Sequence, residues 1–136
     1  MLVVEDRETD AYIINKAIQK LGHDVEVSVA GSVAAAQAFL LAAARGERRH
    51  PTVVMLDLQL PDGPGLTLIE WARAQPALAF TRFVVVSNYL DNAITRLAYA
   101  AGANSVVPKH NIMDDLNAVR SVADYWLSVN RPLLAR

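Results

Sequence analysis

The sequence of 136 residues contains no cysteine, and its charges nearly balance, with 13 lysines and arginines against 14 acidic residues. The absence of cysteine excludes a disulfide framework, a zinc–thiolate site and a cysteine nucleophile. The net charge of −1 provides no basic surplus, so nothing in the composition indicates a nucleic-acid partner. Hydrophobic residues make up 53% of the chain and charged residues 20%, which is typical of a globular protein and excludes a disordered one.

Long hydrophobic runs are also missing. The most apolar window, SVAAAQAFLLAAA at residues 32–44, is shorter than the roughly 20 residues that a bilayer requires, and it favours a buried amphipathic helix. Met1 leads directly into LVVED, without the basic segment of a signal peptide. We therefore expect a cytoplasmic protein without a membrane contact. Its length predicts a single domain over residues 1–136.

Short apolar runs alternate with segments of helical spacing, in which Ile14, Ile18 and Leu21 are one example. The runs are residues 2–4, 25–30, 53–56, 83–86 and 105–107. Strands separated by helices predict βαβ units with right-handed crossovers. The sequence therefore predicts an α/β fold, a doubly wound, five-stranded parallel sheet with five helices.

A long final helix is predicted over residues 111–130, followed by a tail to residue 136. Its apolar residues form two adjacent stripes, one ending at Trp126 and the other containing Tyr125, and together they cover about half of the circumference. A surface helix usually needs a narrower apolar arc. The surplus predicts either burial against a second chain or cover by the protein's own domain and tail, and the sequence does not decide between the two.

Polar side chains follow four of the five predicted strands. They are Glu5 and Asp6 after the first strand, Asp57 after the third, Ser87 and Asn88 after the fourth, and Lys109 after the fifth. In doubly wound sheets, ligands bind beyond the carboxyl ends of the strands. We therefore expect three carboxylates, a hydroxyl and an ammonium at one edge of the sheet.

This set of side chains favours phosphoryl-transfer chemistry. Three adjacent carboxylates need a counter-charge, and Mg²⁺ supplies one while keeping water ligands for a phosphate. A lysine and a serine can hold the phosphate oxygens, and a carboxylate can form an acyl phosphate. Asp57 is best placed as the nucleophile because it stands alone after the central strand, whereas Glu5 and Asp6 are better suited to sharing a metal.

The segments LVVED, VVMLDLQLPDGPGL, FVVVSN and GANSVVPK resemble the receiver domains of two-component response regulators. The resemblance extends over essentially the whole chain in order and spacing. It implies a flavodoxin-like fold with strand order 2-1-3-4-5, and a sensor histidine kinase as the phosphate donor. It also implies a phosphoacceptor that catalyses at most its own phosphorylation and dephosphorylation, and not an enzyme acting on a separate substrate.

The resemblance assigns a role to individual residues. Asp57 would be the phosphoacceptor, and Ser87 and Lys109 would grip the phosphoryl oxygens. Glu5, Asp6 and Asp57 would bind Mg²⁺, with Asp6 as the more direct ligand of the acidic pair and the backbone carbonyl of Gln59 completing the set. Asn88, Tyr89 and Val106 occupy the positions for switching or access, and Gln59 and Tyr89 would control the entry of the attacking water.

The sequence departs from the usual receiver pattern around Lys109. Val106 stands where an aromatic ring usually swings inward on phosphorylation, and His110 follows the lysine where a proline is usual. Pro108 precedes the lysine, a position that an edge strand tolerates. A phosphorylation-independent binding module of the same fold therefore stays open as the alternative.

Two further interpretations are weaker. A flavin or nucleotide binder would have a glycine-rich or hydroxyl-rich loop after the first strand, where this chain has EDRETD. A phosphatase of the haloacid dehalogenase kind would have a second aspartate where Gln59 stands.

The ending DYWLSVNRPL resembles stand-alone receivers that partner phytochrome histidine kinases. This narrower resemblance implies a homodimer through the side of the fourth strand and fifth helix, no output domain, and signalling by a change of surface.

Overall fold

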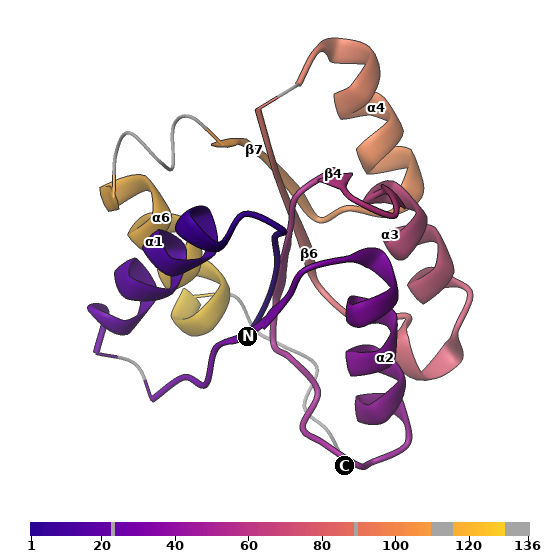
Figure 1. The fold of residues 1–136 in the computed structure, drawn as a ribbon, viewed down its shortest axis with the longest axis horizontal. Helices are drawn as coiled ribbons and strands as arrows, with labels where there is room; N and C mark the ends of the chain where they lie inside the picture. The colour runs from indigo at the N-terminus through magenta and orange to yellow at the C-terminus, as the bar shows by residue number, and fades with distance from the viewer. Residues whose placement is uncertain (23, 89, 110–115, 130–136) are drawn as a thin grey trace.

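Five parallel strands form the central sheet of the computed structural model, which describes residues 1–22, 24–88, 90–109 and 116–129 (Figure 1). The spatial order is β2-β1-β3-β6-β7, and every pairing is parallel. The strands are β1 (Leu2–Val4), β2 (Ser28–Ala30), β3 (Val54–Leu56), β6 (Phe83–Ser87) and β7 (Ser105–Pro108). The predicted fold class is confirmed, because this order is 2-1-3-4-5 when the five strands are counted along the chain.

Helices cover both faces of the sheet, with α1 and α6 on one face and α2, α3 and α4 on the other (Figure 1). Their bounds are α1 (Glu8–Gln19), α2 (Val33–Ala44), α3 (Leu66–Arg73), α4 (Asn92–Ala101) and α6 (Leu116–Asp124). A 3₁₀ turn, η1 (Pro76–Leu78), follows α3, and a π-helical segment, η2 (Tyr125–Val129), follows α6. The side chains of Ser32 and Asp91 cap the N-termini of α2 and α4.

The strands are apolar throughout because each side of the sheet has its own core. Along β3, Val54 and Leu56 pack in the cluster beneath α2, α3 and α4, whereas Met55 packs in the cluster beneath α1 and α6. The same alternation holds in β6, where Val84 and Val85 lie in different clusters. Successive residues of a strand point to opposite faces, so a run buried on both sides must be apolar at every position.

Two details differ from the expectation. The second strand starts at Ser28 and not at residue 25, because its partner β1 is three residues long and Ser28 already pairs with Leu2. A short antiparallel pair, β4 (Gln59–Leu60) and β5 (Gly63–Pro64), follows β3 where only a turn was expected.

The final helix is described from residue 116, so the predicted part over 111–115 and the tail from 130 lie outside the described residues. Ala123 and Trp126 are buried in the core with Ile14 of α1, as predicted for these two residues of the inner stripe. Tyr125 of the outer stripe is 48% exposed and contacts the Trp126 ring edge-on, at 5.1 Å between centroids. Among the described residues, no helix has both the length and the apolar character that a bilayer crossing requires.

Candidate functional site

The carboxyl ends of β1, β3, β6 and β7 meet at one edge of the sheet. Val4 pairs with Leu56, Leu56 with Val85, and Ser87 with Pro108, so these strands end nearly level. The residues that follow them therefore converge. The structure brings together Glu5, Asp6, Asp57 and Lys109 as the sequence predicted.

Lys109 lies at the centre of this group, and its side chain is only 2% exposed. Its Nζ lies 2.6 Å from Glu5 Oε2, 2.9 Å from Asp57 Oδ2 and 2.9 Å from Asp10 Oδ2. An ammonium has three N–H donors, so each can be directed to one carboxylate. Burial alone would lower the pKa of Lys109, but these three carboxylates outweigh it and hold the pKa above its usual value.

The carboxyl of Glu5 has a raised pKa. Burial, with a smaller contribution from the nearby charge of Asp57, raises the pKa of its carboxyl to about 7, against the opposing hydrogen bond from Lys109. The backbone N–H of Arg7 also donates to Glu5 Oε1 at 3.0 Å. The raised pKa of Glu5 therefore reports mainly the removal of its carboxyl from water, and the charge of Asp57 is a smaller cause.

Glu5, Asp6 and Asp57 each offer an oxygen atom, and these three atoms lie within 4.8 Å of one another. Asp6 is exposed at the mouth, whereas Glu5 and Asp57 are buried. Hard divalent cations such as Mg²⁺ prefer oxygen ligands of this kind. The donor set therefore fits a Mg²⁺-type ion, and the excess negative charge favours one.

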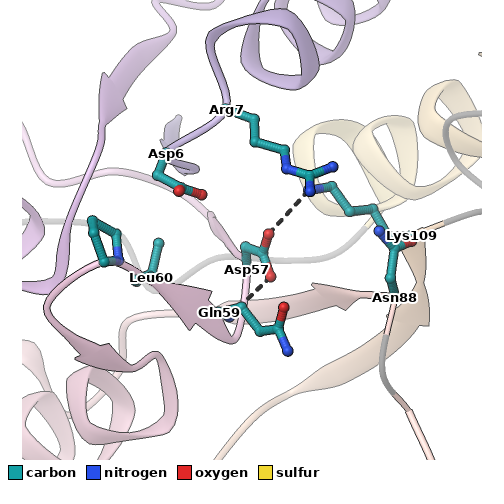
Figure 2. Close-up of a pocket in the computed structure, with 8 residues that line it drawn as sticks. Asp6, Arg7, Asp57, Gln59, Leu60, Asn88 and Lys109 are labelled. Atoms are coloured by element: carbon teal, nitrogen blue, oxygen red, sulfur yellow. Dashed lines mark hydrogen bonds and ion pairs between the residues drawn. The ribbon is translucent and has the colours of Figure 1, made fainter.

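Asp57 opens into a pocket of about 240 Å³. Figure 2 shows Asp57 at its floor, with Asp6 and Arg7 from the β1–α1 connection on one side and Asn88 and Lys109 on the other. Its lining residues are Asp6, Arg7, Asp57, Gln59, Leu60, Pro61, Asn88 and Lys109. A pocket of this size and polarity can admit a phosphate group.

The loop after Asp57 is fixed at both ends. The backbone N–H of Gln59 donates to Asp57 Oδ1 at 3.0 Å. The Asp62 carboxylate accepts hydrogen bonds from Ala34 and Val33 at the start of α2, and these bonds lower the pKa of Asp62. A side chain at Gly65 would collide with the carbonyl oxygen of Asp57, so only glycine permits this close approach.

The remaining predicted site residues have different surroundings. Ser87 is buried as the last residue of β6, and its register partner Pro108 adjoins Lys109. Val106 is partly buried against the core on the α4 side of the sheet. Tyr89 and His110 lie outside the described residues, so the role suggested for Tyr89 stays a prediction.

Two charged residues of the site were missed by the sequence reasoning. Asp10 lies in the first turn of α1 and pairs with Lys109, and Arg7 immediately precedes that helix and lines the pocket. The signal for Asp10 was its place in the acidic segment EDRETD, which follows the first strand. Arg7 had no such signal, because the direction of a long exposed side chain does not follow from spacing.

The chain matches the family of response regulator receiver domains over residues 1–120. The probable methanogenesis regulatory protein FilR2 of Methanothrix harundinacea is 30% identical over 132 residues, which cover 96% of this chain and 85% of that protein. Response regulator Rcp1 of Synechocystis is 25% identical over 129 residues, covering 93% of this chain and 88% of that protein.

Two crystal structures have the same fold. That of the Mn²⁺-bound form of response regulator Rcp1 has a TM-score of 0.87 at 23% identity, covering 98% of this chain and 97% of that one. That of the phosphorylated cyanobacterial phytochrome response regulator RcpA has a TM-score of 0.84 at 24% identity, covering 96% and 95%.

Proposed function

This chain belongs to the family of response regulator receiver domains, and on that premise we propose that it accepts a phosphoryl group from a sensor histidine kinase on Asp57. One contact carries the proposal: Lys109 Nζ lies 2.9 Å from Asp57 Oδ2, beside the carboxylates of Glu5 and Asp6. An ammonium at this distance from the nucleophile is placed to bind the oxygens of a phosphoryl group attached there.

In the proposed transfer, a carboxylate oxygen of Asp57 attacks phosphorus while the P–N bond of the kinase phosphohistidine breaks. The leaving imidazole takes up a proton from the solvent. In the later hydrolysis, water attacks phosphorus and the P–O bond to Asp57 breaks. Inorganic phosphate leaves, and the carboxylate is restored. The chain would catalyse only these steps on itself, and receiver domains are generally not enzymes.

Receiver domains bind Mg²⁺ or Mn²⁺ at an acidic pocket, and the cluster of Glu5, Asp6 and Asp57 fits such an ion. We propose Mg²⁺ as the cofactor, held by these carboxylates and by the backbone carbonyl of Gln59. The bound ion would supply positive charge to the phosphoryl oxygens. Lys109 would give up its bond to Asp57 and bind the phosphoryl group, with Ser87 as a second donor.

Phosphorylation would add charge next to Asn88 and Lys109, at the ends of β6 and β7. We propose that the resulting rearrangement changes the surface of α4 and β7, which another protein then recognises. Partly buried Val106 has no ring, so an inward swing of an aromatic side chain is not part of this mechanism.

Response regulators partner with histidine kinases, and RcpA is described as a phytochrome response regulator. We extend this to the present chain as a proposal: its kinase is a phytochrome, and the signalling takes place in the cytoplasm. Homodimerisation through the side of β6 and α6 is supported by the exposed ring of Tyr125. Aromatic residues are enriched in such interfaces.

The phosphoacceptor is tested by incubating the protein with Mg²⁺ and acetyl phosphate and measuring intact mass. The wild type should gain one phosphoryl group, and the Asp57→Asn variant should gain none. Asp24→Asn, at an exposed position, is the matched control and should be labelled like the wild type. Labelling that persists in Asp57→Asn would move the site elsewhere. An unlabelled wild type would favour the phosphorylation-independent binding module.

A further inference from the structure

Lys109 is not free to meet an incoming phosphate. Its ammonium is buried, and it already bonds Glu5, Asp10 and Asp57. Together with Asp6, the site then holds four carboxylates around this one buried cation. These carboxylates still outnumber the positive charges of Lys109 and a divalent ion taken together. A phosphodonor carries negative charge on its phosphoryl oxygens, so another cation at the mouth would favour its approach.

Arg7 is in the right place to be that cation. It is exposed, it lines the same pocket as Asp57, and Figure 2 shows its side chain directed into the pocket. Within the described part of the chain, its guanidinium makes no hydrogen bond or ion pair. The donors of this group are available to a ligand, unlike those of Lys109.

The backbone position of Arg7 is unfavourable for helix stability. Arg7 is the N-cap of α1, and its side chain makes no capping hydrogen bond. Serine, threonine, aspartate and asparagine stabilise this position because their oxygens accept from the first N–H groups. A cation there also opposes the positive end of the helix dipole. A local conflict of this kind is expected where a residue serves a function.

We propose that Arg7 binds the phosphoryl group of the incoming donor and holds it over Asp57. This deepens the proposed function and rests on it. The ligand chemistry is a phosphoryl group with free anionic oxygens, as in a phosphohistidine or an acyl phosphate. The planar guanidinium matches two such oxygens with a pair of N–H donors, which an ammonium cannot do. Arg7 breaks and forms no covalent bond in this step.

The test measures the rate of Asp57 labelling against the concentration of acetyl phosphate at saturating Mg²⁺. Arg7→Gln should lower the second-order rate constant about tenfold, and Arg7→Lys should restore only part of it. Arg45→Gln, at an exposed arginine that caps the far end of α2, removes the same charge and should label like the wild type. Arg7→Gln should also lose most of the wild type's salt dependence, whereas Arg7→Lys, which keeps the positive charge, should retain it.

Two further readouts separate ligand binding from a structural role. Arg7→Ser should raise the melting temperature, because serine caps α1, while still lowering the labelling rate. Arg7→Gln should bind Mg²⁺ several-fold more tightly by calorimetry, because it removes a cation beside the metal ligands. If the substitution distorted the pocket, both the labelling rate and the affinity for Mg²⁺ would fall.

The outcomes distinguish the two proposals. A wild type that takes no label overturns the phosphoacceptor function and this inference with it. A labelled wild type with an equally fast Arg7→Gln variant overturns the role of Arg7 alone. A slow Arg7→Gln variant that also binds Mg²⁺ weakly would make Arg7 a structural residue and overturn the inference.

Discussion

Lys109 lies at the carboxyl ends of the strands, and Arg73 lies near the amino ends of β6 and β7. The two cations differ in the kind of partner they bind. Lys109 follows β7 and bonds three carboxylates. Arg73, at the end of α3, donates five hydrogen bonds to neutral oxygens in the loops that precede β6 and β7. The acceptors are the carbonyls of Ala79, Thr81 and Gly102, the last of these twice, and the side chain of Asn104.

The difference separates a structural cation, Arg73, from Lys109, for which we propose a role in phosphoryl binding. The neutral acceptors around Arg73 satisfy its guanidinium without competing for its charge, and Phe83 packs 5.2 Å from it. Around Lys109 the carboxylates outnumber the cation, so the region favours a further positive charge. A bound metal ion can therefore compete with Lys109 for its partners, and a phosphoryl group can compete with them for Lys109. The neutral oxygens around Arg73 offer no such competition.

The largest effect on stability is expected from Lys109→Met in metal-free buffer. The variant leaves three carboxylates without their buried partner and should lose about 3 kcal/mol of unfolding free energy. Mg²⁺ should recover more stability in the variant than in the wild type, because it replaces the lost charge. Urea unfolding with and without Mg²⁺ measures both quantities.

Lys20→Met is the control for this experiment, since Lys20 is exposed at the end of α1. It should change stability by less than about 0.5 kcal/mol, as surface substitutions usually do. If Lys109→Met were as stable as the wild type without metal, the carboxylates would not depend on Lys109, and the contrast with Arg73 would disappear.

Arg73→Met should have the next largest effect, a loss of about 2 kcal/mol, because several backbone carbonyls lose a charged donor. The loss should not depend on Mg²⁺, and labelling of Asp57 should continue at the wild-type rate in buffer where the variant is folded. Arg96→Met, at an exposed position on α4, serves as the control. Mg²⁺-dependent recovery in Arg73→Met would show that the two edges of the sheet are coupled.

The two regions also differ in how far the sequence predicts them. Each residue around Lys109 except Asp10 and Arg7 follows a strand, and parallel strands present their carboxyl ends at one edge. The convergence of Glu5, Asp57 and Lys109 is therefore a consequence of topology. The bonds of Arg73 depend on two crossover loops that approach the end of α3, and no local pattern in the sequence encodes this approach.

The same reasoning explains the smaller errors. The pair β4–β5 is set by contacts outside its own four residues: Asp62 binds the start of α2, and Gly65 packs on the backbone of Asp57. The burial of Ala123 in α6 and of Trp126 in η2 follows from the helical period of the sequence. What covers the outer stripe at Tyr125 does not follow from a single chain, so the dimer stays a prediction.

The smallest expected effect is a dependence of the unfolding free energy on pH, caused by Glu5 beside Lys109. Burial raises the pKa of Glu5 to about 7 in the folded chain, above its ordinary value of 4.5. Between these values the folded chain holds a proton that the unfolded chain releases. The free energy of unfolding should therefore rise as the pH falls through about 7, and this gain should be complete near 4.5.

Urea unfolding of the metal-free protein across this pH range measures the effect, and Glu5→Gln should remove it because glutamine does not titrate. Glu70→Gln, at an exposed glutamate of α3, should keep the wild-type profile. Saturating Mg²⁺ should also flatten the profile, since a bound cation favours the ionised carboxylate. An equal slope in the wild type and Glu5→Gln would show that another group causes the pH dependence. The difference between Lys109 and Arg73 would then lie only in their partners, which are charged for Lys109 and neutral for Arg73.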